Sequence, residues 1–153
     1  MKILLALDGS PFSDAVVDEA TRRPWPADSE VKIFSVFEHP ILPIVEGWAP
    51  SGDYYAEIVR VAEEQAQSIV QKAAHEIHNR QGDKLLITTA VLEGQPRFAI
   101  LGEAERWGAD LILVGSHGYR GLTKLWLGSV SQAVATHAKC SVEIVRSRKE
   151  QNG

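Results

Sequence analysis

Five short apolar runs, separated by longer segments of helical periodicity, are the feature that most limits how this chain can fold. The runs that predict strands are residues 2–7, 31–37, 85–92, 111–114 and 142–145. The first and fourth are almost continuously apolar rather than alternating, which is typical of strands buried on both faces of a parallel sheet. The sequence therefore predicts an α/β fold.

The segments between these runs predict helices, each with a recognisable start or stop. The first begins at Pro11 after an N-cap at Ser10, the second runs from about residue 53 to 81 before Gly82, the third begins at Pro96 and is closed by Gly108, and the fourth begins at Ser129. Strand and helix thus alternate along the whole chain. With right-handed crossovers, we expect a single doubly wound five-stranded parallel sheet with helices on both faces.

Two strand orders are compatible with this pattern, namely 3-2-1-4-5 and 2-1-3-4-5. The length of 153 residues fits one domain, which we place at 1–147, with 148–153 as a frayed tail. The connection from Glu38 to Gly52 contains three prolines and is long for a compact domain. It is either a lid or binding segment, or a rigid surface excursion.

Charge and composition exclude several classes of protein. There are 16 Lys and Arg against 20 Asp and Glu, so the net charge is −4 and no basic stripe is present to bind nucleic acid. No apolar stretch approaches the roughly 20 residues that cross a bilayer. The single cysteine, Cys140, cannot form an intramolecular disulfide, and we expect a buried, inert thiol in a cytoplasmic protein.

The stretch from Gly115 to Ser131 is the strongest indication of a ligand site, because it follows a strand and opens a helix. Exposed N–H groups at a helix N-terminus bind phosphate, and glycines let phosphate approach the backbone. The glycines, hydroxyls and cations that would serve this purpose are Gly115, Gly118, Gly128, Ser129, Ser131, Arg120 and Lys124. The alternative is that the glycines form turns, Ser129 is an ordinary N-cap and the cations are solvated. The spacing is neither a Walker A loop nor Gly-x-Gly-x-x-Gly.

Asp8 lies at the end of the first strand, directly before Gly9-Ser10. In the order 3-2-1-4-5, the first and fourth strands are neighbours, so Asp8 would face the glycine-rich stretch at the topological switch point. A carboxylate there is suited to accept from a ribose hydroxyl or an adenine amino group. The alternative is a turn residue that caps the first helix.

On these residues the chain resembles the universal stress protein family, in its ATP-binding branch. The pattern Gly, two residues, Gly, nine residues, Gly-Ser/Thr is met by Gly115, Gly118, Gly128 and Ser129. The resemblance implies the order 3-2-1-4-5, ATP or AMP at the switch point, and a homodimer through the last strand, Ser141 to Arg146. The nucleotide-binding residues that it implies are Ala6, Leu7, Asp8, Val36, Val114, Gly115, His117, Gly118, Gly128, Ser129, Val130 and Ser131.

The loop and Asp8 favour a nucleotide-dependent regulatory module that binds ATP with Mg²⁺, and the resemblance implies a role in the stress response. The alternatives are a slow ATPase or phosphoryl-transfer enzyme using the same pocket, and an interaction protein whose pocket is vestigial. No set of nucleophile, base and acid can be assembled, so we assign no catalytic residue. His75 and His78 are spaced to share a metal ion, but no further ligands are placed near them and we expect both to be solvated.

Overall fold

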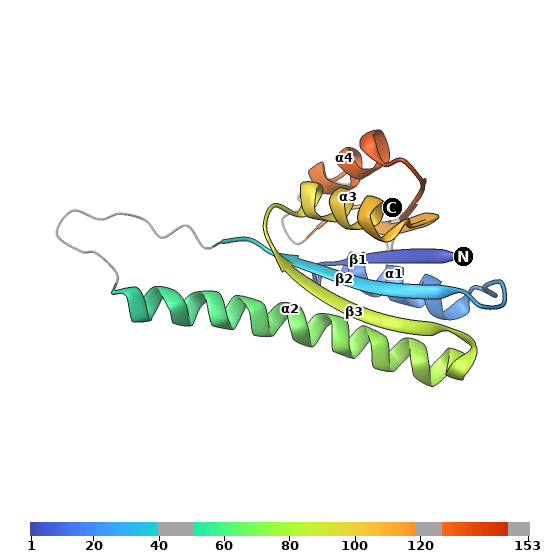
Figure 1. The fold of residues 1–153 in the computed structure, drawn as a ribbon, viewed down its shortest axis with the longest axis horizontal. Coiled ribbons are helices and arrows are strands. Elements are labelled where there is room, and N and C mark those ends of the chain that lie inside the picture. The colour runs from blue at the N-terminus through green and yellow to red at the C-terminus, as the bar shows by residue number, and fades with distance from the viewer. Residues whose placement is uncertain (40–50, 119–126, 147–153) are drawn as a thin grey trace.

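The computed structural model describes residues 1–39, 51–118 and 127–146. Its centre is a five-stranded sheet in the order β3-β2-β1-β4-β5, with every adjacent pair parallel. Figure 1 shows β1, β2 and β3 side by side. The strands are β1 (Lys2–Leu7), β2 (Glu30–Phe37), β3 (Leu86–Glu93), β4 (Leu111–Gly115) and β5 (Ser141–Val145). The predicted fold class is confirmed, and so is the order 3-2-1-4-5.

Four α-helices cover the two faces of the sheet in pairs. They are α1 (Pro11–Arg22), α2 (Gly52–Gln81), α3 (Pro96–Trp107) and α4 (Ser129–His137), with a short 3-10 turn, η1 (Gly82–Lys84), after α2. Side chains of α1 and α2 share one apolar core with the sheet, and those of α3 and α4 share the other. Because β1 lies between both cores, alternate residues point into each: Leu5 into the first core and Leu4 into the second.

Local sequence signals explain where the helices begin and end. Ser10 caps α1, because its side chain accepts a hydrogen bond from the N–H of Ser13, and Pro11 follows at the first helical position. Gly108 ends α3 in a left-handed conformation with φ 70°, and its N–H bonds back to the carbonyls of Ala104 and Glu105. These caps confirm the boundaries that the sequence predicted for the two helices.

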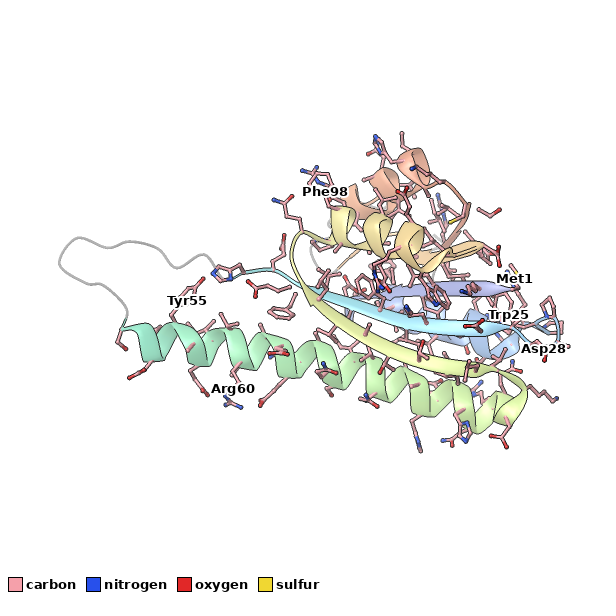
Figure 2. All side chains as sticks on the ribbon, in the orientation of Figure 1. Met1, Trp25, Asp28, Tyr55, Arg60 and Phe98 are labelled. Atoms are coloured by element: carbon pink, nitrogen blue, oxygen red, sulfur yellow. The ribbon has the colours of Figure 1, made fainter. Side chains whose placement is uncertain are left out.

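The helix α2 is much longer than the strands it covers. Its 30 residues span about 45 Å, whereas an eight-residue strand spans about 26 Å. Its N-terminal half therefore extends past the sheet, and Figure 2 shows Tyr55 and Arg60 on that half. Within the described residues, none of the helices combines the length and apolar character needed to cross a membrane.

Some predictions from the sequence lie outside the described residues: most of the connection from Glu38 to Gly52, the cations Arg120 and Lys124, and the tail 148–153. His75 and His78 are both exposed. Cys140 is half-buried rather than buried, and desolvation by this partial burial raises the pKa of its thiol, which disfavours the reactive thiolate.

Candidate functional site

The carboxyl ends of β1 and β4 lie side by side. Ala6 pairs with Val114 in the parallel register, so Asp8 and the stretch that begins at Gly115 leave the sheet at the same edge. The crossover from β1 leads away from β4, toward β2, which makes this pair the switch point of the doubly wound sheet. The adjacency that the candidate site requires is therefore present.

The turn between β1 and α1 holds Asp8 by its own backbone and by Ser13. The carboxylate Oδ1 of Asp8 accepts from the N–H of Ser10 at 3.0 Å and from the hydroxyl of Ser13 at 2.7 Å. The hydroxyl of Ser13 also accepts from the N–H of Asp8 at 2.8 Å. Asp8 thus supports the turn, as the alternative interpretation predicted, while Ser10 is the residue that caps α1.

The second carboxylate oxygen of Asp8 faces the stretch that follows β4. A Cβ atom added to Gly118 would lie 2.9 Å from Oδ2 of Asp8, which is closer than real Cβ contacts allow. Any larger residue at position 118 would push the carboxylate aside. The glycine here therefore permits a close approach between the Asp8 carboxylate and the backbone segment that follows β4.

Gly115 and Gly128 permit close backbone packing of a different kind. A Cβ on Gly115 would lie 2.8 Å from Cβ of Phe12 in α1, and a Cβ on Gly128 would lie 3.2 Å from Cα of His117. The N–H of Gly128 also donates to the carbonyl of Ser116 at 2.9 Å. These two glycines thus have packing reasons of their own, as well as any role toward a ligand.

At the start of α4, Ser129 is not the N-cap, contrary to the alternative interpretation from the sequence. The N-cap is Gly128, which has no side chain to cap the helix, and Ser129 is the first helical residue. The first turn of α4 therefore offers N–H groups that no N-cap side chain satisfies, as anion sites at helix N-termini do.

Ser131 directs its hydroxyl toward backbone carbonyls at the end of β4. The hydroxyl donates to the carbonyl of Gly115 at 2.6 Å and lies 3.2 Å from that of Ser116. Its proton therefore ties α4 to the end of β4, and donation from Ser131 to a phosphate stays a prediction. Ser131 is buried and contributes to the wall of the site.

A cleft opens between these elements and brings together most of the predicted residues. Those that line it are Ala6, Leu7, Asp8, Val36, Val114, Gly115, His117, Gly118, Val130 and Ser131. Gly128 and Ser129 do not line it but stand next to Val130 at the start of α4. Four lining residues were not predicted from the sequence: Ser13, Phe34, Pro96 and Ile100.

Two of these four carried a signal in the sequence. Phe34 precedes Val36 by two positions on the same strand, so both face the same side of β2. Ser13 lies one helical turn beyond the cap of α1. Pro96 and Ile100 line the cleft only because α3 packs across the carboxyl edge of the sheet, and this packing is a tertiary contact.

The cleft has an apolar part and a polar part. Ala6, Phe34, Val36, Ile100 and Val114 supply the apolar walls, which suit a flat heterocyclic ring. The polar part consists of the Asp8 carboxylate, the glycine-containing segment and the start of α4.

His117 belongs to the polar part of the cleft. Its ring packs against Phe12 with centroids 5.3 Å apart, and its Nδ1 lies 3.2 Å from the Ser116 hydroxyl.

No group of three or more His, Cys, Asp or Glu side chains that could hold a metal ion occurs in the described part of the chain.

Comparisons with known proteins agree with this architecture. The model of the universal stress protein family matches residues 1–146. Universal stress protein Sll1388 of Synechocystis is 33% identical over 156 residues, covering 95% of this chain and 97% of its own length.

Solved structures show the same fold. The hypothetical protein MJ0577 superposes with a TM-score of 0.80 at 23% identity, covering 96% of both chains. A universal stress protein family member from Arabidopsis thaliana with AMP bound has a TM-score of 0.64 at 16% identity, covering 100% of this chain and 95% of its own.

Proposed function

The chain belongs to the universal stress protein family, and from that premise we propose that it binds ATP or AMP in the cleft between β1 and β4. Nucleotide state would then regulate its affinity for other proteins in the stress response. The observation that carries the proposal is the meeting of Asp8 with the glycine-containing segment 115–118 across an apolar cleft. An AMP-bound relative of the same fold supports the same ligand class.

The residues of the cleft fit the three parts of an adenine nucleotide. The apolar walls formed by Phe34, Val36 and Val114 would enclose the base. The Asp8 carboxylate would accept hydrogen bonds from the ribose hydroxyls. The phosphates would lie at the first turn of α4 and along the glycine-containing segment, where backbone N–H groups and the helix dipole favour negative charge.

Magnesium fits this arrangement as a partner of the phosphates. Mg²⁺ commonly keeps several waters and uses one or two carboxylates besides the phosphates. Of the described residues that line the cleft, Asp8 alone carries a carboxylate, and its Oδ1 already supports the turn before α1. We therefore expect Mg²⁺ to enter with ATP rather than to occupy a site of its own.

A slow ATPase or phosphoryl-transfer enzyme is the second candidate for the same cleft. Among the described residues that line it, Asp8 and His117 are the ionisable side chains apart from hydroxyls. The Nδ1 atom of His117 lies against Ser116, and the ring packs on Phe12. Within the described part of the cleft, these two groups would have to position an attacking water, so we expect turnover below about 1 s⁻¹, the lower end for ordinary enzymes.

Titration calorimetry of the purified chain with ATP, AMP and GTP tests the proposal. We expect both adenine nucleotides to bind, and Gly118→Val to weaken ATP binding by at least about tenfold, because the added side chain displaces the Asp8 carboxylate from the cleft. Gly102→Val is the matched control, since nothing lies within 4 Å of its added Cβ on α3. Absence of heat at millimolar nucleotide, or equal affinity in the Gly118 variant, would contradict the proposal.

We also propose a cytoplasmic homodimer through the edge strand β5. The strand is short and lies at the end of the sheet, so its outer backbone groups are available for pairing with a second chain. The N–H of Ser141 bonds to Asp110 and the carbonyl of Val145 accepts from Ser116, so the N–H and C=O groups of Val142 and Ile144 point outward. These two residues would form the new ladder.

A further inference from the structure

The opposite edge of the sheet, β3, has a sequence that is symmetric about its centre. Read from either end, the seven residues 86–92 begin with leucine, continue with a β-branched residue and a small residue, and meet at Thr89. We propose that β3 pairs antiparallel with β3 of a second copy of this chain, about a two-fold axis at Thr89. The proposal concerns a different edge from the β5 pairing and does not depend on nucleotide binding.

The backbone of β3 is oriented for such pairing. At one end the N–H of Leu86 donates to Ser29 at 3.2 Å, and at the other the N–H of Gly94 donates to Phe37 at 3.0 Å, so both point toward the sheet. The direction of the backbone N–H and C=O groups alternates from residue to residue along a strand. The groups of Ile87, Thr89 and Val91 therefore point away from the sheet. Figure 1 shows β3 as the outermost strand on this side.

Common protections against edge pairing are missing from this strand. Natural edges are blocked by proline, lysine, bulges or very short strands. Between positions 86 and 92 there is no proline, glycine or charged residue, and β3 is eight residues long. The uncharged stretch 86–92 can approach an identical stretch without electrostatic repulsion, and the charged residue of β3, Glu93, lies at the end of the strand.

A two-fold axis at Thr89 satisfies the outward backbone groups. It places Thr89 opposite Thr89, and Ile87 opposite Val91, so that outward-pointing residues always face one another. Each such pair exchanges two hydrogen bonds, which gives about six for the interface. A shift of the register by one residue would place outward-pointing backbone groups of one strand opposite inward-pointing groups of the other. The hydrogen bonds between the two strands would then be lost.

The same register brings the exposed leucines into contact. Leu86 is 62% exposed and Leu92 is 48% exposed, and they lie on the face of β3 opposite to α2. In the paired sheet Leu86 of one copy lies directly opposite Leu92 of the other, in the closely spaced type of antiparallel pair. The interface would then bury two leucine pairs whose side chains are exposed to solvent in the single chain.

The helical layer is compatible with the continuous sheet. Because α2 packs on both β2 and β3, its axis lies roughly between them. With neighbouring strands about 4.8 Å apart, the two copies of α2 would lie about 10 Å apart, which is a normal helix-packing distance. The groove beside β3, lined by Gln71, Ala74, His75, His78, Ile87 and Thr89, would be covered by the second copy.

These observations favour a second copy over an unrelated extended peptide. A peptide would gain the backbone hydrogen bonds but not the symmetric leucine pairs or the second α2. The symmetric sequence makes this edge its own complement, as an isologous interface requires.

Disulfide trapping tests the register directly. Two proteins are made in a Cys140→Ser background, one with Leu86→Cys and one with Leu92→Cys, and they are oxidised separately and as an equal mixture. Opposite residues in this type of pair have Cα atoms about 4.5 Å apart, which a disulfide can span. We expect a covalent dimer in the mixture at least about tenfold above either protein alone.

Two further results keep this test decisive. Thr89→Pro removes an outward N–H without breaking a bond to β2, so adding it to both proteins should abolish the disulfide while circular dichroism stays native. A Phe98→Lys change, at another exposed apolar residue away from the edge, should leave trapping unchanged. Equal trapping in mixed and separate samples, or trapping that survives Thr89→Pro in folded protein, would overturn the proposal, whatever β5 or the nucleotide does.

Discussion

Gly9 joins β1 to the turn before α1 in a backbone conformation that other residues rarely adopt. Its φ is +78°, and an added Cβ would lie 2.8 Å from Cδ1 of Ile69 in α2. Gly9→Ala therefore combines left-handed strain with a clash between two elements. We expect it to lower the free energy of unfolding by about 2 kcal/mol, measured by urea denaturation.

Gly102 provides the comparison for this prediction. Gly102 is an exposed residue in the middle of α3, and nothing lies within 4 Å of an added Cβ. Alanine should stabilise the helix there by roughly 0.5–1 kcal/mol, because it is the better helix former. If both alanine variants shift stability in the same direction, the explanation from local conformation fails.

At the scale of elements, a buried carboxylate on α3 forms an ion pair with a lysine of β2. Glu103 is 7% exposed, and its carboxylate accepts from Lys32 of β2 at 2.8 Å and from Arg106 at 2.5 Å. Lys32 also lies 4.6 Å from the centre of the Trp107 ring. Glu103→Gln should cost about 1–3 kcal/mol at pH 7, because it leaves the half-buried Lys32 without its counterion.

The pH dependence of this contact follows from the pKa of Glu103. Desolvation raises the pKa, but hydrogen bonds from Lys32 and Arg106 outweigh it, so the net pKa lies below the ordinary value of 4.5. The stabilisation is therefore complete above about pH 4.5 and disappears as the pH falls through the lowered pKa of the folded state. Denaturation of wild type and Glu103→Gln should converge on acidification.

A neighbouring pair serves as the control. Glu105 on the same helix is 61% exposed and pairs with Lys139, which is 75% exposed, at 2.5 Å. Exposed pairs contribute little, so Glu105→Gln should change stability by less than about 0.5 kcal/mol at any pH. A larger loss than at Glu103 would show that burial is not the deciding factor.

At the scale of the whole molecule, one ion pair connects the first helix with the last strand. Arg23, directly after α1, donates to both carboxylate oxygens of Glu143 in β5, at 2.6 and 2.7 Å, and to Glu19 at 2.8 Å. The hydrogen bonds to Glu143 are the largest contribution to the raised pKa of Arg23. The contact steadies the edge strand β5 from the opposite end of the chain.

A double-mutant cycle measures that connection. Arg23→Gln and Glu143→Gln should each destabilise the chain, and their coupling should be about 0.5–1 kcal/mol, reduced by salt because both side chains are partly exposed. Amide exchange in β5 should also accelerate in both variants. Strict additivity of the two changes would rule out the coupling.

The fold was predictable at the level of elements because its signals are local. Apolar runs located every strand to within about one residue at each end, and Ser10, Pro11 and Gly108 marked helix boundaries through bonds to their own neighbours. The strand order has no such local signal. The pattern left two orders open, and only the resemblance to a family favoured the one that the structure confirms.

The site was predictable in part for the same reason. Asp8 and the glycines were found because they follow strands along the chain. The role of Ser131 was not found, since its hydroxyl proton goes to the carbonyl of Gly115, sixteen residues away. Pro96 and Ile100 were missed because they reach the cleft only through the packing of α3 on the sheet.

The sequence by itself thus determined the alternation of strands and helices, the helix caps and the residues at strand ends, because each depends on hydrogen bonds and steric limits within a few positions. The tertiary structure decided which strand ends meet, how close Asp8 comes to Gly118, and which edges of the sheet remain open. Those features depend on how separate elements pack, and packing between distant segments leaves no periodic trace in one chain.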